Sequence, residues 1–154
     1  MVINLRNNLT HKIMKTLKIM LAGIALLFAS VAANATVKLH PNPITQTDVV
    51  NMYINAVTTG NTDNLDKILD NDLQFNTARG ANVNTLNKDQ LVDFIKANTV
   101  SGLAVTTDTT VLTSDNGTLK VKVDFKYDGY TRTDVLSLVK TNSWKVTAVD
   151  SSTK

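Results

Sequence analysis

TLKVKVDFKYDGYTRTDVLSLVK, residues 118–140, is the stretch that decides the fold. Apolar side chains occupy every second position from Leu119 to Tyr127, and lysine or aspartate stands between them. A period of two is typical of a strand with one buried and one solvated face. Asp128-Gly129 then predicts a tight turn, so the two halves should form a β-hairpin. We expect the rest of the chain to cover the buried face of this hairpin.

A two-residue turn also predicts which residues face each other across the hairpin. The expected pairs on the buried face are Tyr127–Tyr130, Phe125–Arg132, Val123–Asp134, Val121–Leu136 and Leu119–Leu138. One end of the hairpin is therefore aliphatic, while the polar and aromatic side chains gather near the turn. If the turn before Trp144 has three residues, Asp150 lies on the same face opposite Asp134.

The residues before this hairpin predict three helices that cover the sheet. The helices are expected at 48–59, 63–69 and 88–97, with Thr47, Thr62 and Asn87 as their N-caps. Strands are expected at 73–77, 83–86, 103–114, 118–127, 130–140 and 144–150, with a turn at Gly80. Helices followed by a meander of strands indicate an α+β fold with an antiparallel sheet covered on one face.

The first 35 residues are typical of a secretory signal peptide. A short cationic segment from Met14 to Lys18 precedes an apolar run at 19–29, and Ala33-Asn34-Ala35 has the form that signal peptidase cleaves. The apolar run is well short of the ~20 residues that span a bilayer, which favours cleavage over an anchor. We expect an exported, periplasmic or secreted protein without membrane association after cleavage. Met1 and Met14 both stay open as the start.

Composition excludes several classes of function. The net charge of +3 rests on four basic residues of the leader, and residues 36–154 carry 12 basic against 13 acidic side chains. This balance lacks the basic surface that nucleic-acid binding needs. Without cysteine there is no disulfide or thiolate metal site, and His40 is the one histidine after residue 35. We expect neither a metal nor a cofactor. Residues 36–47 form a flexible lead-in, and 48–152 form the domain.

The ordered set of motifs resembles the nuclear-transport-factor-two-like superfamily, and in particular its subgroup named for lumazine binding. The matching segments are VVNMYINAVTTGNTDNLDKIL at 49–69, NKDQLVDFIKAN at 87–98 and VKVDFKYDGYTRTDVLSLVK at 121–140. The resemblance implies a cone-shaped α+β barrel, in which a curved antiparallel sheet wraps around an N-terminal helix with two further helices. It also implies a largely apolar pocket inside the cone and frequent dimers.

The same superfamily includes the ketosteroid isomerases, whose catalytic pattern this chain does not keep. Their oxyanion-hole tyrosine matches Tyr53, but their base falls at Thr77 or Asn76 and their second acid at Leu138 or Ser137. None of those four residues carries the carboxyl group that the reaction needs. The resemblance therefore favours a protein that is not an enzyme.

Six residues are the candidates for a ligand site: Tyr53, Phe75, Tyr127, Tyr130, Arg132 and Asp134. Arg132 either binds an anionic ligand group at the pocket mouth or forms an ion pair with Asp134 or Asp150 that closes the end of the sheet. Tyr53 either donates its hydroxyl to a ligand or packs in the core. Phe75 is more typical of core packing, but it would also fit a pocket wall.

Three functions follow as hypotheses. The first is a non-catalytic module that binds a small apolar or amphipathic molecule, with Tyr53 and Arg132 as its polar anchors. The second is a homodimeric interaction protein that pairs through the outer face of the sheet and has a filled pocket. The third is an isomerase- or hydrolase-like enzyme that uses Asp134 and Asp150 as an acid pair.

Overall fold

The computed structural model describes residues 43–79, 82–100 and 102–154. The predicted signal peptide, most of the lead-in and the turn at Gly80 lie outside these residues. The helices of the described part are α2 (Gln46–Thr59), α3 (Leu65–Ile68) and α4 (Lys88–Asn98). Its strands are β1 (Leu69–Arg79), β2 (Asn82–Leu86), β3 (Thr106–Asp115), β4 (Thr118–Tyr127), β5 (Tyr130–Lys140) and β6 (Trp144–Thr153).

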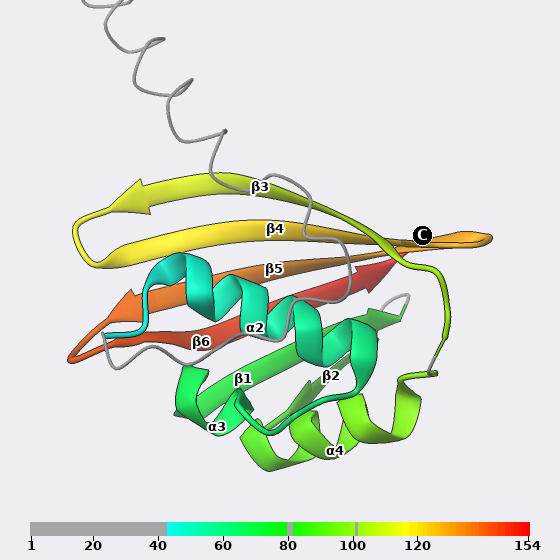
Figure 1. Ribbon diagram of the computed structural model, residues 1–154, viewed down its shortest axis with the longest axis horizontal. Helices are drawn as coiled ribbons and strands as arrows, with labels where there is room; N and C mark the ends of the chain where they lie inside the picture. Colours follow the sequence, from blue (N-terminus) through cyan, green and yellow to red (C-terminus); the bar gives the residue numbers. More distant parts are fainter. Residues whose placement is uncertain (1–42, 80–81, 101) are drawn as a thin grey trace, which may run out of the picture.

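The six strands form one curved, unclosed sheet in the order β2-β1-β6-β5-β4-β3. Helix α2 lies across the concave side of this sheet, while α3 and α4 lie near β1 and β2 (Figure 1). The α+β fold with a sheet curved around an N-terminal helix is thereby confirmed. The sheet is mixed rather than antiparallel as expected, because β1 and β6 run parallel. The meander from β3 to β6 begins at the edge of the sheet opposite β2. It ends with β6 beside β1, and the two strands run in the same direction.

Helix α2 begins two residues earlier than the sequence predicted, and its N-cap is Thr45 rather than Thr47. The Thr45 hydroxyl accepts a hydrogen bond from the Asp48 amide at 3.1 Å, and the Asp48 carboxylate accepts one from the Thr45 amide at 2.9 Å. This reciprocal capping box satisfies two backbone donors that a helix start leaves unpaired. The helix ends where expected, because Gly60 adopts a φ of 74°, which is unfavourable for other residues.

The other elements agree with their predicted positions and differ mainly at their ends. Strands β4 and β5 have the predicted bounds, and α4 begins after Asn87 with the predicted Gln90 capping box. Helix α3 is shorter than expected and begins after Asn64, not Thr62. Strands β1 and β6 are longer than expected, because Ala78 and Arg79 also pair with β2, and Ser152 and Thr153 also pair with β5.

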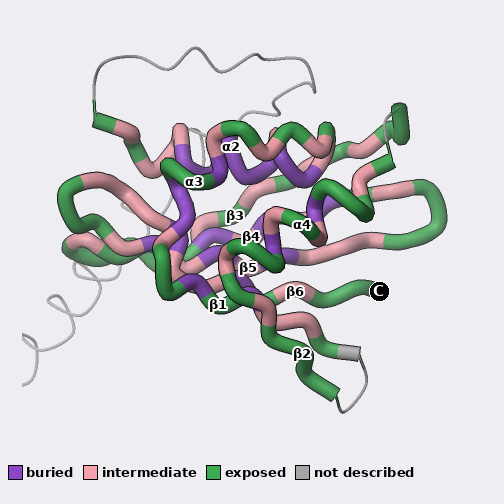
Figure 2. Tube along the Cα trace, turned by 90° about the horizontal axis from the view of Figure 1, so that it is seen from below, coloured by how far each residue is buried: buried purple, intermediate pink, exposed green. Residues whose placement is uncertain are grey.

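The core lies between the inward face of α2 and the concave face of the sheet. Buried residues gather along α2 and the central strands, while β2 is exposed over most of its length (Figure 2). Leu119 and Leu138 pair with each other in the aliphatic end of the hairpin and are almost fully buried. Each such side chain contributes about 1.5–3 kcal/mol by leaving water. The aliphatic end therefore seals the core, and space remains toward the Asp128-Gly129 turn.

Candidate functional site

The β4–β5 hairpin has the register that its turn predicts. All five expected pairs are present, from Tyr127–Tyr130 at the turn to Leu119–Leu138 at the far end. Gly129 has a φ of 88° and so adopts the left-handed conformation that the turn requires. Because alternate residues face the same side of a sheet, Arg132 and Asp134 both lie on the concave side.

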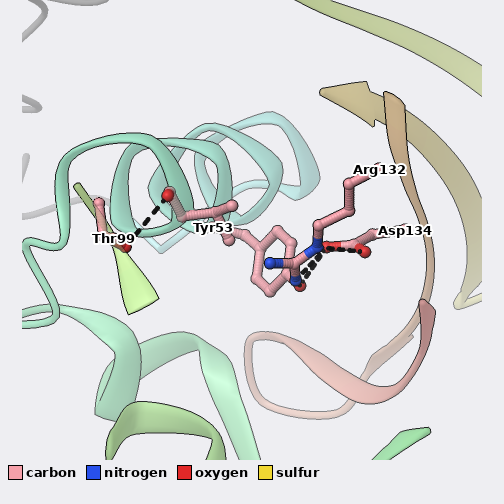
Figure 3. A network of polar contacts seen from close by, with 5 residues as sticks. Tyr53, Thr99, Arg132 and Asp134 are labelled. Atoms are coloured by element: carbon pink, nitrogen blue, oxygen red, sulfur yellow. Dashed lines mark hydrogen bonds and ion pairs between the residues drawn. The ribbon is translucent and has the colours of Figure 1, made fainter. Parts of the chain in front are cut away.

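Arg132, Asp134 and Tyr53 form one hydrogen-bonded network on this concave side (Figure 3). The Arg132 guanidinium binds the carboxylate side-on, with Nε donating to Oδ1 at 2.9 Å and Nη2 donating to Oδ2 at 2.7 Å. Tyr53, on helix α2, donates its hydroxyl to Asp134 Oδ2 at 2.7 Å. The Tyr53 oxygen also lies 3.5 Å from Arg132 Nη2. The network therefore joins the helix to β5 through the core.

Burial sets the electrostatics of this network. Asp134 is fully buried, and the Arg132 side chain is only 16% exposed. Burial raises the pKa of Tyr53 well above its usual value, and the negative charge of Asp134 raises it further. Burial lowers the pKa of Arg132, but the neighbouring Tyr53 and Asp134 outweigh that effect and raise it overall. At neutral pH the phenol and the guanidinium thus both act as donors to the carboxylate.

The guanidinium of Arg132 also lies against two aromatic rings. Its Cζ atom is 5.7 Å from the ring centre of Phe75 and 5.7 Å from that of Phe125. Such contacts attract the cation to the ring faces and restrict its movement. Within the described residues Nη1 has no hydrogen-bond partner, whereas every fully buried side-chain polar atom there has one. Nη1 therefore reaches space that water or a ligand can enter.

Arg132 lines a cavity of about 290 Å³ at the turn end of the hairpin. Its wall comes from the ends of α2 and α4, the connection from α4 to β3, and the ends of β4, β5 and β6. The lining residues are Val57, Thr58, Phe94, Ile95, Asn98, Thr99, Val100, Leu103, Val105, Tyr127, Tyr130, Arg132 and Thr153. Arg132 is the one charged residue among those that line the cavity.

Two tyrosines form the aromatic part of the wall. The rings of Tyr127 and Tyr130 stack with their centres 4.6 Å apart and their planes at 11°. Burial raises the pKa of Tyr127, although the positive charge of Arg132 opposes this shift. Both residues line the cavity beside Arg132. The cavity thus offers flat apolar surface next to one fixed hydrogen-bond donor.

The six candidate residues divide into two layers. Tyr127, Tyr130 and Arg132 line the cavity itself. Tyr53, Phe75 and Asp134 are fully buried and lie against Arg132 without lining the cavity. Tyr53 is therefore a core tyrosine bonded to Asp134, and the ion pair between Arg132 and Asp134 is formed. These contacts fix the guanidinium in the cavity wall, and they leave Nη1 without a hydrogen-bond partner among the described residues.

The proposed acid pair of Asp134 and Asp150 is wrong. Strand β6 carries one extra residue at Thr147, since Leu138 pairs with Val146 while Ser137 pairs with Ala148. Such a β-bulge shifts every later residue by one position and so reverses the face to which it points.

As a result Asp134 pairs with Ser151, and Asp150 pairs with Val135. Asp150 is exposed, and its carboxylate accepts a hydrogen bond from Asn76 Nδ2 at 2.9 Å. The two carboxylates therefore lie on opposite faces of the sheet.

Sequence reasoning missed the wall that faces the hairpin. Thr99 closes the C-terminal end of α4, and its hydroxyl lies 2.8 Å from the Ile95 carbonyl and 3.3 Å from the Val57 carbonyl. The contact with Val57 brings the end of α4 to the end of α2 (Figure 3). The apolar residues after α4 are the available signal, but the strand predicted at 103–114 includes Leu103. The observed strand begins at Thr106, so Leu103 belongs with Val100 to the connection.

Within the described residues no cluster of three or more histidine, cysteine, aspartate or glutamate side chains is arranged to hold a metal ion. No helix in that part of the chain is long and apolar enough to cross a membrane.

A curved sheet wrapped around helix α2, with a cavity at its open end, defines a nuclear-transport-factor-two-like protein. Solved structures share this fold. An NTF2-like protein of unknown function from Silicibacter pomeroyi DSS-3 matches with a TM-score of 0.62 and 14% identity over 70% of this chain and 92% of that one. Another from Shewanella baltica OS155 matches with a TM-score of 0.59 and 14% identity over 70% and 90% of the two chains.

The family within this superfamily follows from the sequence. The model of the family described as "Putative lumazine-binding" matches residues 44–149, and the chain belongs to that family. A further NTF2-like protein from Cytophaga hutchinsonii is 19% identical over 69% of this chain and 93% of that one, with a TM-score of 0.55. No curated protein matches the chain.

Proposed function

We propose that this protein is a binding module that holds a small apolar or amphipathic molecule in the cavity without catalysis. The observation that carries the proposal is the Arg132 guanidinium, which lines the cavity while Asp134, Phe75 and Phe125 fix its position. A donor held in one orientation binds a ligand acceptor at little cost in side-chain entropy. The rest of the wall is apolar or uncharged, as in most small-molecule sites.

The lining residues support binding better than catalysis. None of them is a carboxylate or a histidine, the side chains that most often transfer protons near neutral pH. Tyr127, which is one of them, has a raised pKa and so keeps its proton. Asp134 is bonded to three donor groups behind the wall. We therefore propose that the cavity binds and releases its ligand unchanged.

The family name suggests lumazine as a first ligand to test. Lumazine is a flat heteroaromatic compound with carbonyl groups. Its carbonyl oxygen would accept a hydrogen bond from Arg132, and its rings would lie against the stacked pair of Tyr127 and Tyr130.

The test is native mass spectrometry of the protein purified without denaturation from its own host, before and after addition of lumazine. Thr153 is exposed and lines the cavity, so Thr153→Trp should fill it without disturbing the core. Ser152 is also exposed but does not line the cavity, and Ser152→Trp is the matched control. We expect a retained or added ligand mass on the wild-type protein and on Ser152→Trp but not on Thr153→Trp. Equal ligand mass on both variants, or none on any of the three, contradicts the proposal.

We also propose export, with cleavage after Ala35. The support is the sequence of residues 1–35, with its cationic start, apolar run and Ala33-Asn34-Ala35. Intact mass measurement of the protein from the periplasm or medium should give a chain that begins at Thr36. A chain that keeps its leader in that fraction contradicts this proposal.

A second candidate function is self-association through the outer face of the sheet. The outward side chains of β5 are uncharged along the whole strand, namely Thr131, Thr133, Val135, Ser137 and Val139. A second copy could pack on them, and the neighbouring Lys122 and Asp124 of β4 already form an ion pair with each other on the same face. Size-exclusion chromatography with light scattering tests this, with Val135→Arg against Val83→Arg on the exposed edge strand β2. A dimer that only Val135→Arg dissociates supports it, and a wild-type monomer at about 100 μM contradicts it.

A further inference from the structure

The inward side chains of β5 become more exposed step by step toward the turn. Asp134 is fully buried, the Arg132 side chain is 16% exposed, and Tyr130 is 44% exposed. These residues follow one another on the same face of the strand, so the gradient gives the cavity a direction. Its inner end has the Arg132 donor, and its mouth has the Tyr130 ring.

The mouth has more apolar surface than an isolated exposed residue would give. Val100 is 60% exposed and Leu103 is 53% exposed, and both line the cavity together with Tyr130. We call these three residues the apolar rim. Two other large apolar side chains of the described part are similarly exposed, Val83 and Leu112, and neither lines the cavity. Single exposed apolar residues are normal, but three around one opening indicate a binding surface.

The charges at the inner end indicate which polar group fits there. The Asp134 carboxylate lies 2.7 Å from Arg132 Nη2 and balances the guanidinium charge. No other charged residue in the described part of the chain lines the cavity. A ligand carboxylate at Nη1 would therefore add a second negative charge close to Asp134, with only one positive charge to balance both. A neutral carbonyl group accepts the same hydrogen bond without that repulsion.

We propose that the ligand is a small neutral amphiphile that enters acceptor-first, bonds Arg132 with its carbonyl oxygen, and leaves its apolar part against the apolar rim. This inference rests on the function proposed above and adds the chemical class and orientation of the ligand. Most of the polar contact is made inside the cavity, and most of the apolar contact is made at its mouth. The cavity volume of about 290 Å³ limits only the part of the ligand that enters.

The test compares three probes by isothermal titration calorimetry at pH 7: hexanamide, hexanoate and acetamide. Leu103→Ser shortens the rim, and Leu112→Ser is its matched control because Leu112 is 48% exposed on β3 away from the cavity. We expect Leu103→Ser to weaken hexanamide binding about 5-fold and Leu112→Ser to change it less than about 2-fold. Acetamide, which has no chain to reach the rim, should bind both variants equally. Hexanoate should bind the wild-type protein more weakly than hexanamide.

The orientation of the ligand is measured separately by NMR. The ¹⁵N resonance of Arg132 Nε should shift when hexanamide or acetamide is added. Hexanamide could shift this resonance and yet bind Leu103→Ser as tightly as the wild type. That result would contradict the contact between the ligand and the apolar rim, but it would leave the function proposed above in place. Tighter binding of hexanoate than of hexanamide overturns the neutral class. If no probe binds and the purified protein retains no ligand, the proposed function itself fails. Val100→Ser replaces Leu103→Ser if circular dichroism shows that the latter does not fold.

Discussion

Tyr53 and Asp134, 81 positions apart in the sequence, share a 2.7 Å hydrogen bond that fastens helix α2 to strand β5 behind the cavity. Both residues are fully buried. The bond therefore belongs to the core, and yet its acceptor Asp134 also binds Arg132, which is the charged residue among the described residues that line the cavity. The first two predictions measure how much this bond and the neighbouring ion pair contribute to stability.

Tyr53→Phe should lower the free energy of unfolding by about 1–2 kcal/mol. The variant removes one of three donors to a buried carboxylate and keeps the aromatic ring in place. Urea unfolding followed by circular dichroism measures the change. Tyr130→Phe, at an exposed tyrosine, is the control and should cost less than about 0.5 kcal/mol. Equal losses in the two variants would show that the hydrogen bond contributes nothing to stability.

Arg132→Met should lower the free energy of unfolding by about 3–5 kcal/mol. It leaves the buried Asp134 carboxylate without its counter-charge. The double variant Arg132→Met/Asp134→Leu removes both charges and should recover most of that loss. The measurement is a double-mutant cycle from urea unfolding of the wild type, the two single variants and the double variant. If the losses of the two single variants add up to the loss of the double variant, Arg132 and Asp134 do not contribute to stability as a pair.

The free energy of unfolding should decrease above about pH 10. Burial raises the pKa of Tyr53 above its ordinary value of 10.0, so the folded chain keeps a proton that the unfolded chain releases. The contribution is complete below pH 10 and is lost as the pH rises toward the folded pKa, by at most ~1.4 kcal/mol per unit. Urea midpoints between about pH 9 and about pH 11.5 measure this decline. Tyr127, whose pKa burial also raises, adds to it.

The matched protein for this pH series is Tyr53→Phe, in which the decline should be shallower because it lacks one of the two phenols whose pKa is raised. An identical slope in the variant would mean that Tyr53 does not hold its proton more tightly in the folded state.

Deletion of Thr147 should cost far less free energy of unfolding than deletion of Ser137. Thr147 is the extra residue of β6 at the bulge, so its removal leaves Val149 opposite Leu136 and Asp150 opposite Val135. Ser137 is paired on both sides, and its deletion should turn a buried leucine of β5 out of the core and cost more than about 3 kcal/mol. Circular dichroism and urea unfolding compare the two deletion variants. Equal losses would contradict the assignment of Thr147 as the bulge residue.

Thr45→Ala should destabilise the domain by about 0.5–2 kcal/mol, whereas Thr47→Ala should change it little. Thr45 caps helix α2 through Asp48, while Thr47 lies inside the first turn. Thermal unfolding of both variants distinguishes the observed N-cap from the one that the sequence predicted. A larger loss for Thr47→Ala would contradict the observed helix start.

Local patterns predicted the parts of the fold that local interactions determine. The hairpin register depends on two turn residues and a period of two, and all its pairs agree with the sequence prediction. The predicted start of α2 was wrong because Thr45 and Thr47 are both favourable N-cap residues. The residue that decides between them is Asp48, which stands three positions after Thr45 and completes a capping box.

The parts that failed depend on contacts between distant segments. The bulge at Thr147 leaves no mark in the sequence, since it adjusts β6 to β5 on one side and to β1 on the other. The wall formed by Val100 and Leu103 depends on how α4 packs against α2. The polar residues near the turn could be named from the sequence. Which of them line the cavity and which are buried behind it depends on how helix α2 packs against the sheet.

The pairing of β1 with β6 has a consequence for the order in which the chain can fold. Strand β1 (residues 69–79) lies between β2 and β6, and it gains this second neighbour only when residues 144–153 are present. The sheet is therefore completed only after β6 has been made. Pairing over such a separation slows folding and disfavours a finished domain during synthesis. A chain of this topology stays open until its last strand is made. That state suits passage through a narrow export channel, as the proposed leader would require.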